Sequence, residues 1–304
     1  EKNIPVLFGE PYIEEFPGQI ECKFDLFGTC FFFLSRLEEY IVKERDSHNR
    51  FPATASIAYK YGFLDRPVVD EYVEMLYNMM NHLDPSIIRK QRTGRVQVTC
   101  DVDKPFDPVR RSIFLTLRVS IAALLKRHRV DEFINRISLF IRHSLGISSP
   151  DEYLDTIYWI MDSNEKVNNR VLFNFIPMIT SKVMDGKNRI NSNETKRLLH
   201  EITRRGHAIG IHPGYNTYNN DGLFSKSVRN FLEVLDNCDI KPEHISGRHH
   251  YLRWDMGKTP LLWETASLHI DSTLSFADHA GFRCGTAHEF QLYHCIQRRV
   301  MNIR

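Results

Sequence analysis

Hydrophobic and polar residues follow two alternating patterns from the middle of the chain onward. Apolar and polar residues alternate singly from Arg95 to Asp103 (RVQVTCDVD), which predicts a half-buried strand. Further strands are predicted at 171–176, 207–212 and 270–271. Apolar residues at helical spacing predict helices at 191–206, 224–238 and 260–268. Strands that alternate with helices indicate parallel strands joined by crossover connections, and therefore an α/β fold.

Residues 1–92 predict a small mixed N-terminal domain, and residues 93–304 a second, larger one. A strand is expected at Ile4–Phe8, and a helix is expected to begin at Pro67 and to end at Asp84. The segment from His48 to Pro67 is rich in aromatic and charged residues. We interpret it as packing surface, with the lining of a cleft as the alternative.

Residues 108–161 predict a helical insertion with two or three amphipathic segments. Between Asp107 and Leu145 there are eight basic and three acidic residues, a net charge of +5. The basic residues are Arg110, Arg111, Arg118, Lys126, Arg127, Arg129, Arg136 and Arg142. One hypothesis is that these helices meet an anionic lipid or a lipid-linked substrate. The alternative is a solvated helix face.

Composition narrows the class of protein. The 304 residues carry a formal charge of only +2, which gives no overall reason to expect nucleic acid, and no apolar run is long enough to span a membrane. Six cysteines lack C-x-x-C spacing, so a reducing cytoplasm is expected, with a peripheral position at the inner membrane if the basic helices bind lipid. The chain begins at Glu1 and ends abruptly in RRVMNIR, so a fragment is expected.

Two carboxylates mark the end of the first predicted strand. Asp101 and Asp103 are two residues apart and therefore point the same way, and Lys104-Pro105 ends the strand. Adjacent carboxylates repel unless a cation or a proton separates them, which favours a metal site with one ligand and one free base. The alternative is a solvated strand end. His212 and the segment 248–253 follow later strands, and the ends of parallel strands meet in one pocket.

These segments resemble polysaccharide deacetylases of the NodB-homology type, carbohydrate esterase family four. TCDVD is similar to the family's first motif, which implies that Asp101 is the general base and Asp103 a metal ligand. RRGHAIGIHPGYN is similar to the metal-binding histidine motif, which places the ligand at His212 and puts Asn216 where the family has a second histidine. GRHHYLR is similar to the third motif, which implies that Arg248 orients the base.

The departure at Asn216 leaves the third ligand open. His250, two residues after Arg248, is the candidate nitrogen ligand, and Asn216 is the alternate through its carbonyl oxygen. The remaining resemblance, strongest to the divergent branch associated with bacterial surface-polysaccharide assembly, suggests substrate-binding residues. These are Tyr251, Arg253, Asp271 and Arg283, although Arg283 is alternatively a brace for its loop.

The resemblance implies a distorted (β/α) barrel and a divalent metal, most simply zinc. The implied reaction is hydrolysis of the N-acetyl group of a sugar in a surface polysaccharide or its precursor. The family's fifth motif, with the histidine that protonates the leaving amine, does not occur before Arg304, so His250 or His288 is the candidate acid. Two alternatives stand: a glycan-binding or scaffold protein that has lost catalysis, and a glycosyltransferase in which DVD is a D-x-D motif.

Overall fold

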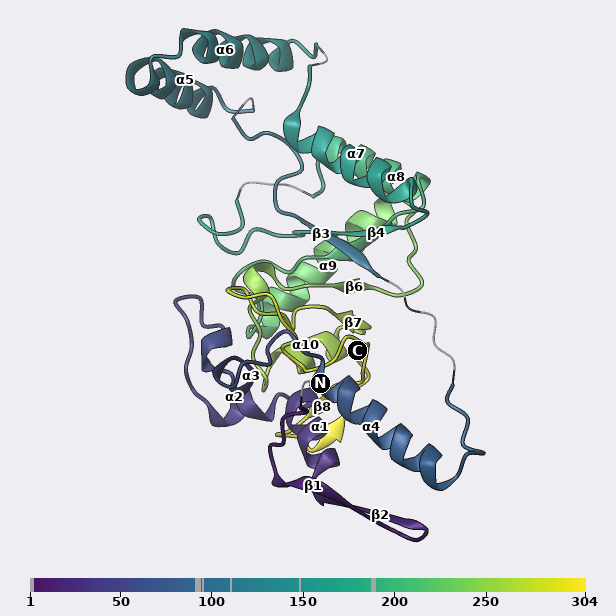
Figure 1. Ribbon diagram of the computed structural model, residues 1–304. Helices are drawn as coiled ribbons and strands as arrows, with labels where there is room; N and C mark the ends of the chain where they lie inside the picture. The colour runs from purple at the N-terminus through teal and green to yellow at the C-terminus, as the bar shows by residue number, and fades with distance from the viewer. Residues whose placement is uncertain (1–2, 91–93, 95, 110, 148, 187–189) are drawn as a thin grey trace. The chain divides into compact units, whose positions relative to one another are not determined.

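The computed structural model describes residues 3–90, 94, 96–109, 111–147, 149–186 and 190–304 (Figure 1). Arg95, Arg110 and the predicted domain boundary at 92–93 lie outside the described residues. The chain divides into two compact units. The first comprises Glu1–Val96, Pro213–Arg229 and Glu243–Arg304, and the second comprises Gln97–His212 and Asn230–Pro242.

The second unit contains three strands and the helices between them. In chain order these are β3 (Val98–Val102), α5 (Ile113–Arg127), α6 (Val130–Ser144), α7 (Glu152–Glu165), β4 (Val171–Phe175), α8 (Asn193–Arg204) and β5 (Ala208–Ile211). Ser192 caps α8 by accepting from the Thr195 N–H, and Gly206, with φ +79°, follows its last turn. All five residues of β4 are buried, so β4 forms the core of this unit.

Parallel pairing aligns the strands of this unit. Asp101 of β3 lies opposite Asn174 of β4, and Asn174 lies opposite Gly210 of β5. The first unit supplies a parallel pair, β6 (Ser246–Gly247) with β7 (Ile270–Asp271). Because the strands are parallel, residues that follow β3, β5, β6 and β7 follow carboxyl ends, which is where sites form in open α/β sheets.

The predicted (β/α) barrel is wrong. Among the described strands, β3, β4 and β5 pair in parallel within the second unit, β6 pairs with β7 in parallel within the first, and the remaining strands form two antiparallel pairs. A barrel closes about eight parallel strands on themselves, whereas the described residues hold five parallel strands, of which β6 and β7 are only two residues long. The α/β class and the parallel pairing of the strands were inferred correctly, but closure was inferred from the resemblance alone.

The first unit contains mostly short elements. They are β1 (Gly9–Phe16), β2 (Gln19–Phe24), α1 (Leu26–Leu34), α2 (Leu37–Ile41), η1 (Ala53–Ala55), α3 (Ile57–Lys60), α4 (Val68–Leu83), β6, η2 (His250–Leu252), α10 (Thr259–Thr265), β7, β8 (Tyr293–His294) and β9 (Arg299–Val300). Helix α9 (Asp221–Asn237) begins in this unit and ends in the other. The strand expected at Ile4–Phe8 is wrong, because the β1–β2 hairpin follows that segment instead.

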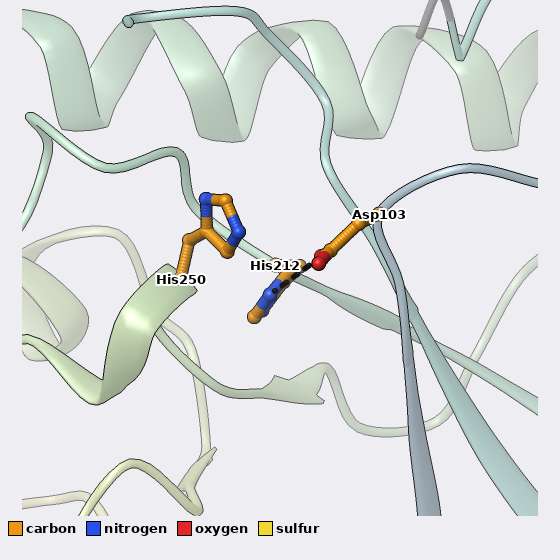
Figure 2. Close-up of side chains that lie close together, drawn as sticks. All are labelled: Asp103, His212 and His250. Atoms are coloured by element: carbon orange, nitrogen blue, oxygen red, sulfur yellow. Dashed lines mark ion pairs between the residues drawn. The ribbon is translucent and has the colours of Figure 1, made fainter. Parts of the chain in front are cut away.

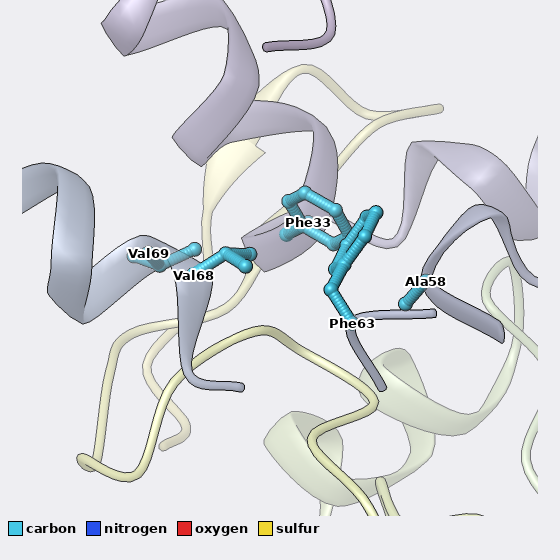
Figure 3. Packing of buried hydrophobic residues seen from close by; sticks show 5 residues of the cluster. All are labelled: Phe33, Ala58, Phe63, Val68 and Val69. Atoms are coloured by element: carbon cyan, nitrogen blue, oxygen red, sulfur yellow. The ribbon is translucent and has the colours of Figure 1, made fainter. Parts of the chain in front are cut away.

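Side chains from α1, α3, α4 and the segment between α3 and α4 form a core in the first unit (Figure 3). Phe33, Phe63 and Val68 are its most deeply buried members, and the Phe33 and Phe63 rings meet edge to face at 6.2 Å. Gly285 packs against this core with φ +66°, and a Cβ there would lie 3.1 Å from Val69. The C-terminal segment therefore packs against the N-terminal helices. Among these, α4 is flanked by Pro67 and Asp84, where the sequence predicts its start and its end.

No helix in the described ranges combines the length and the apolar character that crossing a membrane requires.

Candidate metal centre

Asp101 is held by a buried asparagine from the neighbouring strand. The Asn174 side chain is fully buried within the apolar strand β4, and its Nδ2 donates to Asp101 Oδ1 at 2.8 Å. The parallel register places the two residues opposite each other, so the contact follows directly from the strand pairing. The hydrogen bond orients one carboxylate oxygen and leaves the exposed Asp101 at the rim of a groove.

Asp103 and His212 meet at the ends of β3 and β5. The His212 Nε2 lies 3.4 Å from Asp103 Oδ1; the imidazole is almost fully buried, whereas half of the Asp103 side chain is exposed. This distance is long for a charge-assisted hydrogen bond. Two ligand atoms bound at roughly 2.0–2.1 Å to one tetrahedral zinc ion lie about 3.3–3.4 Å apart, so the pair fits a shared ion.

His250 is held within the first unit by a backbone hydrogen bond to the residue that follows His212. Its backbone N–H donates to the Pro213 carbonyl at 3.0 Å, and Pro213 is bonded directly to His212. Figure 2 draws the three residues that the sequence predicts as ligands, Asp103, His212 and His250. Two imidazole nitrogens and one carboxylate oxygen form a donor set that suits zinc and other first-row divalent ions.

The segment that carries His250 has an unusual backbone. Tyr251 and Leu252 both have positive φ values, 63° and 55°, which residues other than glycine rarely adopt. Such a conformation persists only where its surroundings impose it. The Arg50 guanidinium donates to the Tyr251 carbonyl at 3.0 Å, and Arg253 Nε donates to the His48 carbonyl at 2.8 Å. Residues 48–50 therefore hold the His250 segment in shape.

Arg248 and Asn216 complete the predicted catalytic and ligand residues. Arg248 directly follows β6 and is half-buried, and its Nε donates to the Ser272 carbonyl at 3.1 Å. The orientation of Asp101 by Arg248 stays a prediction. Asn216 is exposed, and the choice between His250 and Asn216 as the third ligand stays a prediction.

Two of the residues assigned to substrate binding are already engaged in packing. The Arg253 guanidinium is buried between the rings of Tyr215 and Tyr218, 4.0 and 3.9 Å from their centroids. Tyr251 packs against His48, with 4.9 Å between the ring centroids, and is half-buried. These contacts indicate that both residues shape the segment around His250.

The other two residues assigned to substrate binding lie further along the chain. Arg283 is buried and forms two hydrogen bonds of 2.8 Å with the Glu39 carboxylate, which corresponds to the alternative role of a brace. Asp271 lines a cavity of about 380 Å³ together with Arg283 and His288. Burial raises the pKa of Asp271 to about 6, although hydrogen bonds from Thr273 oppose the shift.

An open groove of about 530 Å³ lies beside the two carboxylates. Its lining includes Asp101 and Asp103 from the end of β3 and Tyr153, Ile157 and Ile160 from α7. Tyr153 is substantially exposed, so its ring is available for an apolar ligand face. A polar end with carboxylates and an apolar wall with an aromatic ring is a combination that suits small polar ligands such as sugars.

Sequence reasoning missed Asn174 and residues 48–50. A signal for Asn174 exists, because it is the one polar residue in the otherwise apolar strand VLFNF, and buried polar side chains need a partner. Residues 48–50 act through backbone carbonyls and one guanidinium, so the sequence carries no comparable signal for them.

Residues 2–85 match the model of a family described as "Family of unknown function (DUF7033)". The matched region includes His48 and Arg50 but ends before Asp101 and the candidate ligands. Comparisons with curated proteins and with solved structures found no match.

Proposed function

We propose that this chain is a metal-dependent hydrolase that removes the N-acetyl group from a sugar of a surface polysaccharide or its precursor. The observation that carries the proposal is the 3.4 Å approach of Asp103 Oδ1 and His212 Nε2 next to a second exposed carboxylate, Asp101. A ligand pair beside a second carboxylate that can act as a base is the arrangement that water activation by a metal requires.

Asp103, His212 and His250 hold the ion, for which we propose zinc. A divalent ion held there would supply Lewis-acid chemistry, namely polarisation of an amide carbonyl and a lower pKa for a bound water. Asp101 accepts the proton of that water, and Asn174 keeps its carboxylate in position through the 2.8 Å hydrogen bond. Arg248 is proposed to orient Asp101.

The reaction requires a proton for the leaving nitrogen. Water adds its oxygen to the acetyl carbon, the C–N bond breaks, and the products are acetate and an amino sugar. We propose His288 as the donor of that proton. The alternative donor is His250, in which case Asn216 takes over its role as the third ligand. His288 is exposed and lines the cavity that contains Asp271.

The groove beside Asp101 is the proposed sugar site. The hydrogens on one face of a pyranose ring pack well on an aromatic ring, so Tyr153 is the proposed stacking partner. A cytoplasmic location at a membrane surface is proposed as well. It is supported by the six cysteines, all of which are free thiols, as expected in a reducing compartment.

Acetate release tests the proposal and its alternatives together. Protein loaded with zinc is incubated with N-acetylglucosamine oligomers and with UDP-N-acetylglucosamine, and free acetate and free UDP are measured. We expect acetate from one of these substrates, and a loss of about 10²–10⁴-fold in Asp101→Asn with its metal retained. Zinc-loaded wild type that releases no acetate contradicts the hydrolase, and release of UDP without acetate identifies a glycosyltransferase instead.

A further inference from the structure

The α5–α6 hairpin exposes a continuous series of apolar side chains. On α5 these are Ile113, Phe114, Leu117, Ile121 and Leu125, and on α6 they are Val130, Ile134 and Ile141. Phe114 and Leu125 are each 69% exposed. Within each helix the spacing places these residues along one face, whereas the buried residues of α5 are Thr116, Ser120 and Ala123. No residue of α6 is buried, so this hairpin contributes little to the described core.

Both apolar faces lie on the same side of the hairpin. Helices α5 and α6 are joined by His128 and Arg129 and lie side by side in antiparallel directions (Figure 1). On each helix the centre of the exposed apolar face is rotated about the helix axis by roughly a quarter to a third of a turn from the centre of the less exposed side. This rotation has the same sense on both helices. Antiparallel helices with the same offset present these faces to one side, so they form one apolar surface.

The charge around this surface is positive. Residues 113–144 contain six basic and two acidic residues. The acidic side chains are paired internally, Glu132 with Arg136 at 2.8 Å and Asp131 with Arg129 at 3.0 Å. Arg118 and Lys126 are exposed, and within the described residues neither forms an ion pair. The hairpin therefore combines an apolar face with cations available for an anionic partner.

We propose that the α5–α6 hairpin docks on an anionic lipid surface, with its apolar face in the headgroup region and Arg118, which lies at the edge of that face, at lipid phosphates. Apolar residues on one face with basic residues beside them characterise helices that lie in the membrane interface. A second copy of this chain would cover the apolar residues equally well but would set like charges against each other, so the net charge favours lipid over self-association.

Vesicle binding by the full chain tests this proposal. We measure co-sedimentation with vesicles of phosphatidylcholine alone and of phosphatidylcholine with phosphatidylglycerol, at low and high salt. Binding is expected only to the anionic vesicles and is expected to weaken as salt rises. Phe114→Ser and Arg118→Glu should each weaken it about tenfold. The matched controls are Val167→Ser and Lys166→Glu, at exposed positions after α7, and should leave it unchanged.

The folded state of each variant is checked by circular dichroism, and Leu125→Ser provides a second variant of the apolar face. Absence of binding to anionic vesicles overturns the proposal, as does binding that the hairpin variants leave unchanged. Sedimentation velocity supplies the remaining result: a dimer that Phe114→Ser converts to monomer, without vesicle binding, overturns the lipid surface in favour of a second copy.

Discussion

The Asn174 side chain donates a hydrogen bond to Asp101 at 2.8 Å from the opposite position on the adjacent parallel strand. The Asn174 side-chain amide is fully buried in an apolar strand, and burying an amide lowers the stability of the folded state unless the amide forms a hydrogen bond. Because its partner is the proposed base, we propose that Asn174 positions that base. Its replacement should therefore lower kcat without changing metal binding.

Replacing Asn174 by leucine, which is of similar size, should lower kcat for acetate release by about 10–100-fold. Metal content and KM should stay close to wild type, because neither the ligands nor the groove wall changes. The comparison is Asp103→Asn, which should lose metal and activity together. A loss of zinc in Asn174→Leu would show that the asparagine supports the fold of the site and not Asp101 alone.

Much of the secondary structure of the second unit could be predicted from the spacing at which hydrophobic residues recur along the chain. The strands at 171–176 and 207–212 and the helix at 191–206 are confirmed, because each depends on local chemistry that the sequence displays. The association of Asp103 with His212 was also predicted, from the rule that parallel strands bring their carboxyl ends together.

Long-range pairings could not be predicted in this way. The barrel was wrong because strand closure depends on pairing between segments, which period does not reveal. Arg283 was assigned to substrate, yet its carboxylate partner, Glu39, lies 244 residues earlier in the chain. The roles of Arg50 and His48 likewise depend on a distant segment, because Arg50 donates to the Tyr251 carbonyl and the His48 carbonyl accepts from Arg253 Nε.

The buried Glu39 should make the protein sensitive to acid. Burial alone would raise its pKa, but the guanidinium groups of Arg283 and Arg36 outweigh burial and hold the pKa at about 2. The folded state therefore gains stability that is present above the ordinary value of 4.5 and is lost as pH falls from 4.5 toward 2. Chemical denaturation at several pH values measures this slope.

Glu39→Gln should lower the free energy of unfolding by about 3–5 kcal/mol at neutral pH, because it leaves two buried cations with too little countercharge. The variant should also lose that part of the acid dependence. Glu44→Gln changes an exposed carboxylate on the next segment and should alter the free energy by less than about 0.5 kcal/mol. Equal effects of the two variants would contradict a structural role for the Arg36–Glu39–Arg283 cluster.

Arg50 should influence metal affinity through the backbone of Tyr251. Without its guanidinium the positive φ values at Tyr251 and Leu252 lose a restraint, and the His250 ring loses its fixed direction. We expect Arg50→Ala to weaken zinc about 10–100-fold in a competition titration with a chromogenic chelator. Arg89→Ala, which removes an exposed arginine from the same N-terminal region, is the control and should bind zinc as wild type does.

Zinc should raise the thermal stability of the wild type, because it binds only the folded state. At a free zinc concentration one hundred times the dissociation constant the gain is about 2.7 kcal/mol, which should appear as an upward shift of Tm in differential scanning fluorimetry. His250→Ala should reduce this shift. A shift that is unchanged in His250→Ala would assign the third ligand to another group, with Asn216 as the first to examine.

Metal content tests the central claim most directly. The protein is purified without added metal and without a metal-binding tag, and its metals are counted by mass spectrometry in wild type, His212→Ala and His200→Ala. The account predicts close to one zinc or related ion per chain in wild type and in His200→Ala, whose histidine is exposed on α8. It predicts loss of that ion in His212→Ala. A wild-type chain that carries no metal and cannot be loaded, or a His212→Ala variant that retains the ion, would contradict the metal centre.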